Sequence, residues 1–186
     1  MPKCSHVFVW YEDGLGFRYE VPEQENMGEV VITDEHNEFA LTGDPTCWWI
    51  PVDWDIYEHL YNQTSFSEID ALSKRDHPNL AQTFIPENAV NTPVTLKTDD
   101  GLYLSFHAAN LTDYAGMTLR VNKEANRFES ALVAWADGAK VKQKTPFNTP
   151  WRTIQVADKA GDLIESRLIV NLNEPNVLEG DLSWIK

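Results

Sequence analysis

Cysteine and basic residues are both scarce in this sequence of 186 residues. The two cysteines, Cys4 and Cys47, are too few for a disulfide framework or a four-thiolate zinc site. They leave room for one bridge, but free structural thiols are the favoured interpretation. Lysine and arginine number 15 against 29 aspartates and glutamates, so the formal charge is −14. This balance argues against nucleic acid and anionic membrane surfaces as partners, because both require clustered positive charge.

Long apolar runs are also missing. The apolar stretch at residues 47–52 is far too short to span a membrane. The first six residues hold no apolar signal core and lead directly into the strand-like run Val7-Phe8-Val9-Trp10, so no export signal is visible. Hydrophobic residues, at 42%, and aromatic residues, at 11%, are plentiful. This content excludes a disordered acidic tail, and a chain of this mass buries about 70% of its unfolded surface.

The alternation of apolar and polar residues predicts an all-β fold, a large antiparallel β-sandwich without an internal domain boundary. The dipeptide Asp13-Gly14 predicts a tight hairpin turn between residues 7–10 and 15–21. The other expected pairs are residues 30–33 with 38–41 and residues 94–97 with 102–107. Further strands are expected at residues 117–121, 127–133, 140–144, 151–157 and 163–172, the last forming a long hairpin with the strand that Trp151 begins.

Residues 54–75 do not follow the strand pattern. Ser67 stands three residues before Asp70, which resembles a capping box and predicts a short helix near residues 65–73. The rest of the interval is expected to be a long ordered loop, and loops of this size are usually functional or cover a partner.

The usual catalytic signatures are absent from the sequence. There is no nucleophile elbow, no glycine-rich phosphate loop and no zinc-protease motif. The five histidines lack the spacing of metal ligands.

An aromatic and acidic cluster at residues 48–58 is the first candidate site. The aromatic residues provide flat faces for sugar rings, and the carboxylates can accept hydrogen bonds from hydroxyl groups. Its candidate substrate-binding residues are Trp48, Trp49, Asp53, Asp55 and Glu58, with Trp54 and Tyr57 beside them. In an extended segment, Asp53 and Asp55 would share a face about 6.6 Å apart, which resembles the spacing of an inverting glycosidase. The alternative, which we favour, is that the tryptophans pack against the sandwich and the acids are solvated.

Two further segments stand out. Glu87 lies between Pro86 and Pro93 in a stretch with two asparagines, whose oxygens suit calcium, although an ordinary turn is the favoured interpretation. In the segment Pro150-Trp151-Arg152, the arginine is expected to pair with a carboxylate or to stack on an aromatic ring.

Several of these segments together resemble the N-terminal β-sandwich domain of glycoside hydrolase family 97, which includes bacterial α-glucosidases and α-galactosidases. The specific segments are Pro150-Trp151-Arg152, Leu163-Ile164-Glu165-Ser166 and Asn171-Leu172-Asn173-Glu174-Pro175. Residues 13–20, 48–51, 91–95 and 111–117 also resemble the family, so nearly the whole chain is covered. The resemblance implies a sandwich of the supersandwich, galactose-mutarotase-like type, incomplete at its N-terminal side.

The resemblance also implies an activity and a location. The family's enzymes are exo-acting α-glycosidases with calcium in the active site, and their catalytic carboxylates lie on a (β/α)₈ barrel that would follow Lys186. The intact family protein is expected to be periplasmic or secreted. Glu87 is the preferred metal-side residue, and Ala108 stands where the family often has a glutamate in a His-Glu-Ala-Ala-Leu segment.

Residues 1–186 are therefore expected to form part of the family's N-terminal domain, without catalytic residues of their own and inactive alone. In the intact enzyme the domain would support the barrel and contribute to the substrate pocket and the calcium shell. Its expected partners are α-glucosides or α-galactosides, with α-glucosides favoured, and the barrel of the same polypeptide. Two alternatives remain: a freestanding carbohydrate-binding module that uses Trp48, Trp49 and Trp54, or a purely structural fragment without binding.

Overall fold

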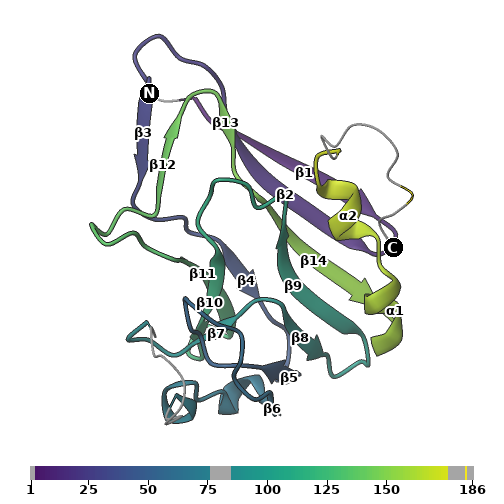
Figure 1. The fold of residues 1–186 in the computed structure, drawn as a ribbon. Helices are drawn as coiled ribbons and strands as arrows, with labels where there is room; N and C mark the ends of the chain where they lie inside the picture. The colour runs from purple at the N-terminus through teal and green to yellow at the C-terminus, as the bar shows by residue number, and fades with distance from the viewer. Residues whose placement is uncertain (1–2, 76–84, 176–182, 184–186) are drawn as a thin grey trace.

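Two facing antiparallel sheets form the body of the molecule in the computed structural model, which describes residues 3–75, 85–175 and 183 (Figure 1). The larger sheet has the strand order β1 (Ser5–Tyr11), β2 (Gly14–Val21), β14 (Trp151–Ala157), β9 (Tyr103–Ala109), β8 (Val94–Lys97), β5 (Thr46–Trp49) and β6 (Asn62–Ser65). A short strand, β13 (Phe147–Asn148), also pairs with β2. This arrangement confirms the predicted all-β sandwich.

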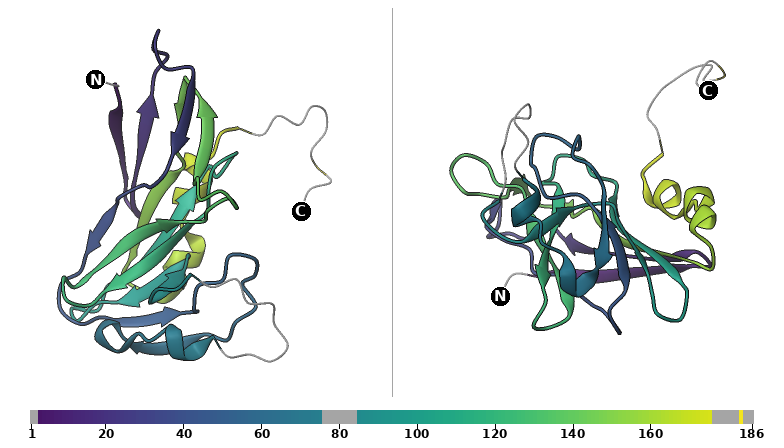
Figure 2. Two further views of the ribbon diagram at one scale, coloured as in Figure 1. Left: turned by 90° about the vertical axis from the view of Figure 1, so that its left-hand side faces the viewer. Right: turned by 90° about the horizontal axis from the view of Figure 1, so that it is seen from below.

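The smaller sheet has the order β4 (Glu38–Ala40), β11 (Arg127–Leu132), β10 (Met117–Asn122) and β7 (Ala89–Asn91). A two-stranded ribbon of β3 (Glu29–Ile32) and β12 (Val141–Lys144) extends above it in Figure 1. The helical elements are two 3₁₀ turns, η1 (Phe66–Glu68) and η2 (Leu72–Lys74), and two short helices, α1 (Ala160–Glu165) and α2 (Leu168–Leu172). In the right-hand panel of Figure 2, the two helices lie to one side of the strands.

The main core fills the space between the two sheets. Cys47 and Trp49 reach it from β5 of the larger sheet, and Phe128 reaches it from β11 of the smaller sheet. Phe106 joins the layers, because its ring centroid lies 5.2 Å from that of Phe39 and 5.9 Å from that of Phe128. Strand alternation therefore decides which side chains enter the core and which face outward.

Two of the three predicted strand pairs are confirmed. β1 and β2 pair from Ser5↔Glu20 to Tyr11↔Gly14, and β8 pairs with β9. The predicted pair of residues 30–33 and 38–41 is wrong, because β3 pairs with β12 and β4 pairs with β11. The residues between β3 and β4 do not form a hairpin turn; Glu35 and Asn37 there are buried and bonded to other segments.

The prediction of a strand over residues 163–172 is also wrong, since this stretch forms α1 and α2. Leu168 and Leu172 lie four residues apart on one side of α2 and pack with Trp151 and Ala109 on the larger sheet. One helical turn brings both leucines onto the sheet, whereas a strand would spread them over about 13 Å.

The helix predicted near residues 65–73 does not form as one unit. β6 ends at Ser65, and η1 and η2 follow as separate turns. The capping contact involves Ser65 and Glu68, whose Oε2 accepts hydrogen bonds from the Ser65 amide at 3.4 Å and from its hydroxyl at 3.0 Å. The expected Ser67–Asp70 pairing is replaced by a bond from the Ser67 amide to Asp44 at 2.8 Å.

Both cysteines are free thiols, as predicted. Cys4 is exposed and Cys47 is buried, so the two lie in different environments. Burial raises the pKa of the Cys47 thiol to about 12.

In the described part of the chain, no helix has the length and apolar content that crossing a membrane requires.

Gly14 is needed where the first hairpin meets β14. Its φ is +146°, and a Cβ there would lie 2.2 Å from the carbonyl oxygen of Ile154. Gly14→Ala is expected to lower the free energy of unfolding by about 3 kcal/mol, because both the backbone and the packing are strained. Gly101→Ala is a matched control, with φ of +99° and no atom within 4 Å of the added Cβ. Gly101→Ala should lower the free energy of unfolding, measured in urea, by about 1 kcal/mol. Equal losses of unfolding free energy for the two variants would contradict the proposed clash with the Ile154 carbonyl oxygen.

Candidate functional site

The two adjacent tryptophans of the predicted aromatic cluster point to opposite sides of β5. Trp49 is 1% exposed in the core, and its Nε1 donates a hydrogen bond of 3.0 Å to Thr64 Oγ1. Its ring faces are covered by protein, which favours the packing interpretation for this residue. Trp48 lies on the other face, where its ring stacks on Tyr103 with centroids 6.4 Å apart and planes 25° from parallel. Of the two, only Trp48 presents ring surface outside the core.

The acidic part of the cluster is divided between the interior and the surface. Asp53 is 2% exposed; its Oδ1 accepts the Asp55 amide at 3.0 Å, and its Oδ2 lies 3.3 Å from Nε2 of the buried His59. Asp55 and Glu58 are exposed. The extended geometry considered for Asp53 and Asp55 is absent, because the bond from the Asp55 amide curls the segment into a turn. The Asp53 carboxylate thus organises the chain locally.

The other aromatic residues of this segment have different surroundings. Trp54 is partly buried and packs against a small cluster that includes Val52 and Ala131. Tyr57 is exposed. The structure therefore does not bring the three tryptophans into one continuous platform.

Glu87 lies on the surface in an ion pair. Its Oε2 accepts a hydrogen bond from Nε of Arg120, and its carbonyl oxygen accepts one from Arg75. Calcium takes six to eight oxygen ligands, and no group of three or more histidine, cysteine or acidic side chains suited to a metal occurs within the described residues. These residues alone do not fit a complete calcium site.

Ala108, where the family often has a glutamate, pairs with Arg152 across β9 and β14.

A buried ion pair joins the loop after β3 to β14. Arg152 is 0% exposed; its Nε lies 2.6 Å from Glu35 Oε1 and its Nη2 lies 2.9 Å from Oε2. Asn37 donates to Oε1 at 2.6 Å and the Tyr114 hydroxyl donates to Oε2 at 2.9 Å. The Arg152 guanidinium also lies 5.7 Å from the Tyr114 ring centroid. The first of the two alternatives predicted for this arginine, a carboxylate partner, is confirmed.

The environment of this ion pair alters the titration of the nearby tyrosines. Burial, followed by the negative charge of Glu35, raises the pKa of Tyr114 far above its ordinary value. The pKa of Tyr19 is raised for the same two reasons, and its hydroxyl donates to Asn37 Oδ1 at 2.5 Å. Both phenols therefore remain neutral donors at ordinary pH, which keeps the network intact.

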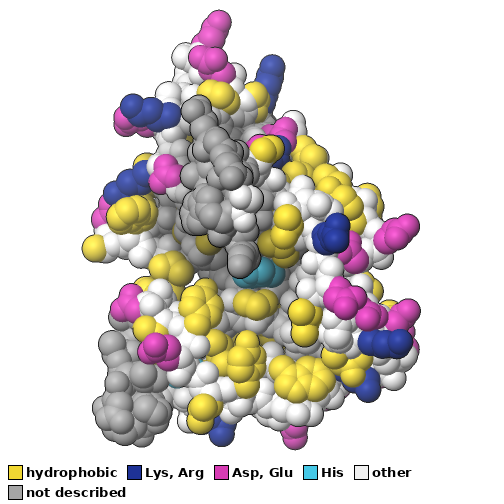
Figure 3. Space-filling model, turned by 45° about the vertical axis from the view of Figure 1, so that its right-hand side comes forward, with side chains coloured by type: hydrophobic (Ala, Val, Ile, Leu, Met, Phe, Trp, Pro, Cys, Tyr) yellow, Lys and Arg dark blue, Asp and Glu magenta, His cyan; other side chains and the backbone are white. Residues whose placement is uncertain are grey.

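The face of the larger sheet opposite the core, here called the outer face, is covered in part by α1 and α2. Trp151 lies under these helices and stacks with Arg18, whose guanidinium carbon is 4.4 Å from the ring centroid. His107 and Thr153 face each other in register, and their Nδ1 and Oγ1 atoms are buried without a hydrogen-bond partner in the described structure. Burial lowers the pKa of His107. Figure 3 shows hydrophobic side chains gathered around a histidine on this side of the molecule.

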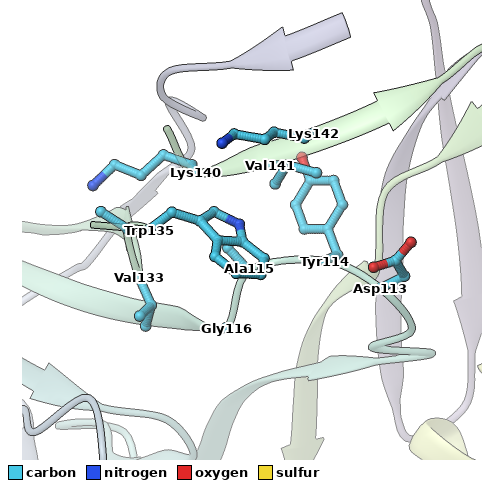
Figure 4. A pocket seen from close by; sticks show the side chains of 10 residues that line it. Asp113, Tyr114, Ala115, Gly116, Val133, Trp135, Lys140, Val141 and Lys142 are labelled. Atoms are coloured by element: carbon cyan, nitrogen blue, oxygen red, sulfur yellow. The ribbon is translucent and has the colours of Figure 1, made fainter. Parts of the chain in front are cut away.

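A hollow of about 420 Å³ lies between the loop that links β9 to β10 and the turn that links β11 to β12. Figure 4 shows the Trp135 indole at its centre, with Asp113 and Tyr114 to one side and Lys140 and Lys142 above. Trp135 is 64% exposed. No motif in the sequence points to this tryptophan, which stands alone before Ala136-Asp137-Gly138. The available signal was an aromatic residue directly before Asp137-Gly138, a dipeptide typical of turns.

The fold and comparisons with known proteins define the class: this chain is the N-terminal β-sandwich domain of a glycoside hydrolase. A family model described as "Glycosyl-hydrolase 97 N-terminal" matches residues 4–175. The chain therefore belongs to glycoside hydrolase family 97, which confirms the family inferred from the sequence.

Solved structures of family 97 enzymes from Pseudoalteromonas sp. strain K8 are similar to the chain over 98% of its length. The enzyme in complex with acarbose is 41% identical with a TM-score of 0.80. A glutamate-to-glutamine variant in complex with panose is 41% identical with a TM-score of 0.81. A β-arabinopyranosidase, 20% identical over 84% of this chain with a TM-score of 0.65, shares the fold. The chain spans about a quarter of the length of each of these proteins.

Proposed function

We propose that this chain is the N-terminal sandwich portion of an exo-acting α-glycosidase, with α-glucosides as the favoured substrates and α-galactosides as the second choice. In the intact enzyme it supports a (β/α)₈ barrel, which would follow Lys186, and forms part of the wall of the substrate pocket. The observation that carries the proposal is 41% identity over 98% of the chain to family 97 enzymes whose structures were solved in complex with acarbose and panose.

The outer face supports the role of a domain that packs against a partner. Apolar side chains gather on this side of the molecule (Figure 3), and large exposed patches of this kind mark interaction surfaces. Trp48 and Tyr103 add a stacked aromatic pair to it. A barrel packed there would remove this apolar area from water, at roughly 25 cal/mol per Å².

The calcium role proposed for the domain is to supply part of the ligand shell of a calcium ion, which other parts of the intact enzyme complete. Glu87 would supply one carboxylate oxygen after release from Arg120. Because Arg120 points outward from β10 of the smaller sheet, the remaining ligands would come from a part of the intact enzyme that reaches this side, and not from the surface packed on the outer face. The intact protein is proposed to act in the periplasm or outside the cell, as the family resemblance implies.

The 186-residue chain alone is expected to show no glycosidase activity. Glycoside hydrolysis requires two carboxyl groups placed on either side of the scissile bond, and Asp53, the buried acid of the aromatic cluster, is bonded to its own turn. Purified chain should therefore release no nitrophenol from nitrophenyl α-glucoside or α-galactoside above the rate without protein. A polypeptide that joins the chain to a family 97 barrel serves as the positive control. Hydrolysis by the chain alone, or inactivity of the joined polypeptide beside an active natural enzyme, would refute the proposal.

A further inference from the structure

The hollow around Trp135 combines three features of a small-molecule site. Its volume of about 420 Å³ lies within the range of ligand pockets. Its lining mixes a large aromatic ring with acidic and basic side chains, among them Asp113, Lys140 and Lys142. The indole itself is largely exposed, although burying it elsewhere would be favourable. An exposed indole at the centre of a hollow suggests that a ligand covers it.

The backbone that carries Trp135 is held in a closed turn. The Trp135 amide donates to the carbonyl of Ala139 at 2.8 Å, and its own carbonyl accepts from the Gly138 amide at 2.9 Å. Asp137 Oδ1 also accepts the Ala139 amide at 3.1 Å. Because the turn is already ordered, presentation of the ring to a ligand costs little additional conformational entropy.

Across the hollow, Asp113 is also fixed in position. Its φ is +48°, a left-handed conformation that a non-glycine residue adopts at some cost. The Gln143 side-chain amide holds it by donating to the Asp113 carbonyl at 2.6 Å and to Oδ2 at 3.3 Å. The carboxylate is therefore placed on one side of the indole with capacity to accept further hydrogen bonds.

The two lysines complete the polar lining. Lys140 Nζ donates to the carbonyl of Leu132 at 2.9 Å, and Lys142 Nζ pairs with Asp137. An ammonium group carries three donors, so each lysine keeps donors for a ligand. The hollow therefore offers hydrogen-bond acceptors with negative charge and hydrogen-bond donors with positive charge around one aromatic face. This combination matches a neutral ring with many hydroxyl groups better than it matches an anion or a cation.

We propose that this hollow is a carbohydrate subsite, in which a pyranose ring of a neutral oligosaccharide stacks on Trp135 and hydrogen-bonds to Asp113 and the lysines. The inference rests on the proposed function, because it assigns a further contact for the oligosaccharide substrates of the intact enzyme. It also replaces the predicted platform of three tryptophans with a single exposed tryptophan elsewhere in the fold.

The test uses the 186-residue chain labelled with ¹⁵N and titrated with maltotriose. The indole N–H signal of Trp135, identified by its loss in Trp135→Ala, is expected to shift saturably in the millimolar range. Trp135→Ala should weaken maltotriose binding at least about tenfold. Trp10→Ala is the matched control, because Trp10 is even more exposed, at 72%, and lies on β1 outside the hollow lining. It should leave the affinity unchanged.

Asp113→Asn provides a second variant that preserves the shape of the side chain. Loss of the carboxylate charge should weaken binding several-fold while the remaining indole signals stay in place. A stationary Trp135 signal, or unchanged affinity in Trp135→Ala, would overturn the subsite. Shifts confined to the Trp48 indole would overturn it too and would favour the Trp48 face as the sugar-binding surface. None of these results bears on the barrel-supporting role, which nitrophenyl glycoside hydrolysis by the joined polypeptide measures separately.

Discussion

Arg152→Met is expected to lower the free energy of unfolding by about 3–5 kcal/mol, because it leaves the Glu35 carboxylate buried without its counter-charge. The residual contacts from Asn37 and Tyr114 stabilise the carboxylate only in part, since neither carries a positive charge. Urea unfolding followed by circular dichroism measures the loss.

Two further variants separate the charge effect from general damage. In the double variant Arg152→Met with Glu35→Gln, the buried charge is removed while an acceptor remains, so the loss should be smaller than the sum of the two single losses. Arg120→Ala, which breaks a half-exposed surface pair with Glu87, should cost about 1 kcal/mol or less. A loss for Arg152→Met no larger than that for Arg120→Ala would show that the buried pair does not stabilise the fold.

Trp49→Ala is expected to destabilise the chain by about 3–5 kcal/mol, since it opens a cavity between the two sheets and leaves the Thr64 hydroxyl without its indole donor. The adjacent residue supplies the control. Trp48→Ala removes an equal side chain from the outer face and should cost about 1 kcal/mol, the value of its stacking on Tyr103. Denaturation midpoints for both variants and the parent chain test this difference.

The comparison of these two tryptophans also tests their proposed roles. If Trp49 served a ligand rather than the core, its replacement would leave the unfolding midpoint near that of the parent chain. If instead Trp48 carried most of the stability, the assignment of faces on β5 would be reversed.

Much of the strand pattern was predictable because it depends on neighbours in the sequence. The Asp13-Gly14 dipeptide and the alternation on both sides of it predict the first hairpin, and the structure confirms the pairing of β1 with β2, with Glu12 and Asp13 as the turn. The hydrophobic and aromatic content was also sufficient to predict a folded chain, and the alternation of apolar and polar residues was sufficient to predict an all-β fold. The family itself followed from short segments such as Pro150-Trp151-Arg152.

The errors occurred where distant contacts decide the local conformation. Residues 163–172 contain apolar side chains compatible with either a strand or a helix, and docking on β14 and β9 selects the helix. The partner of β3 is β12, more than a hundred residues away, although β4 is much closer in sequence. Such pairings depend on how the whole sandwich closes, and no local pattern encodes them.

The candidate sites also divide into features that neighbouring residues specify and features that distant contacts decide. The sequence by itself determined that Arg152 needs a partner and that residues 48–58 concentrate aromatic and acidic groups. Only the tertiary structure decided that Glu35 is that partner, that Trp49 is inside and Trp48 outside, and that Trp135 stands exposed in a hollow. The physical reason is that burial and charge pairing are properties of surfaces brought together from distant parts of the chain, whereas turns and strand periodicity arise from adjacent residues.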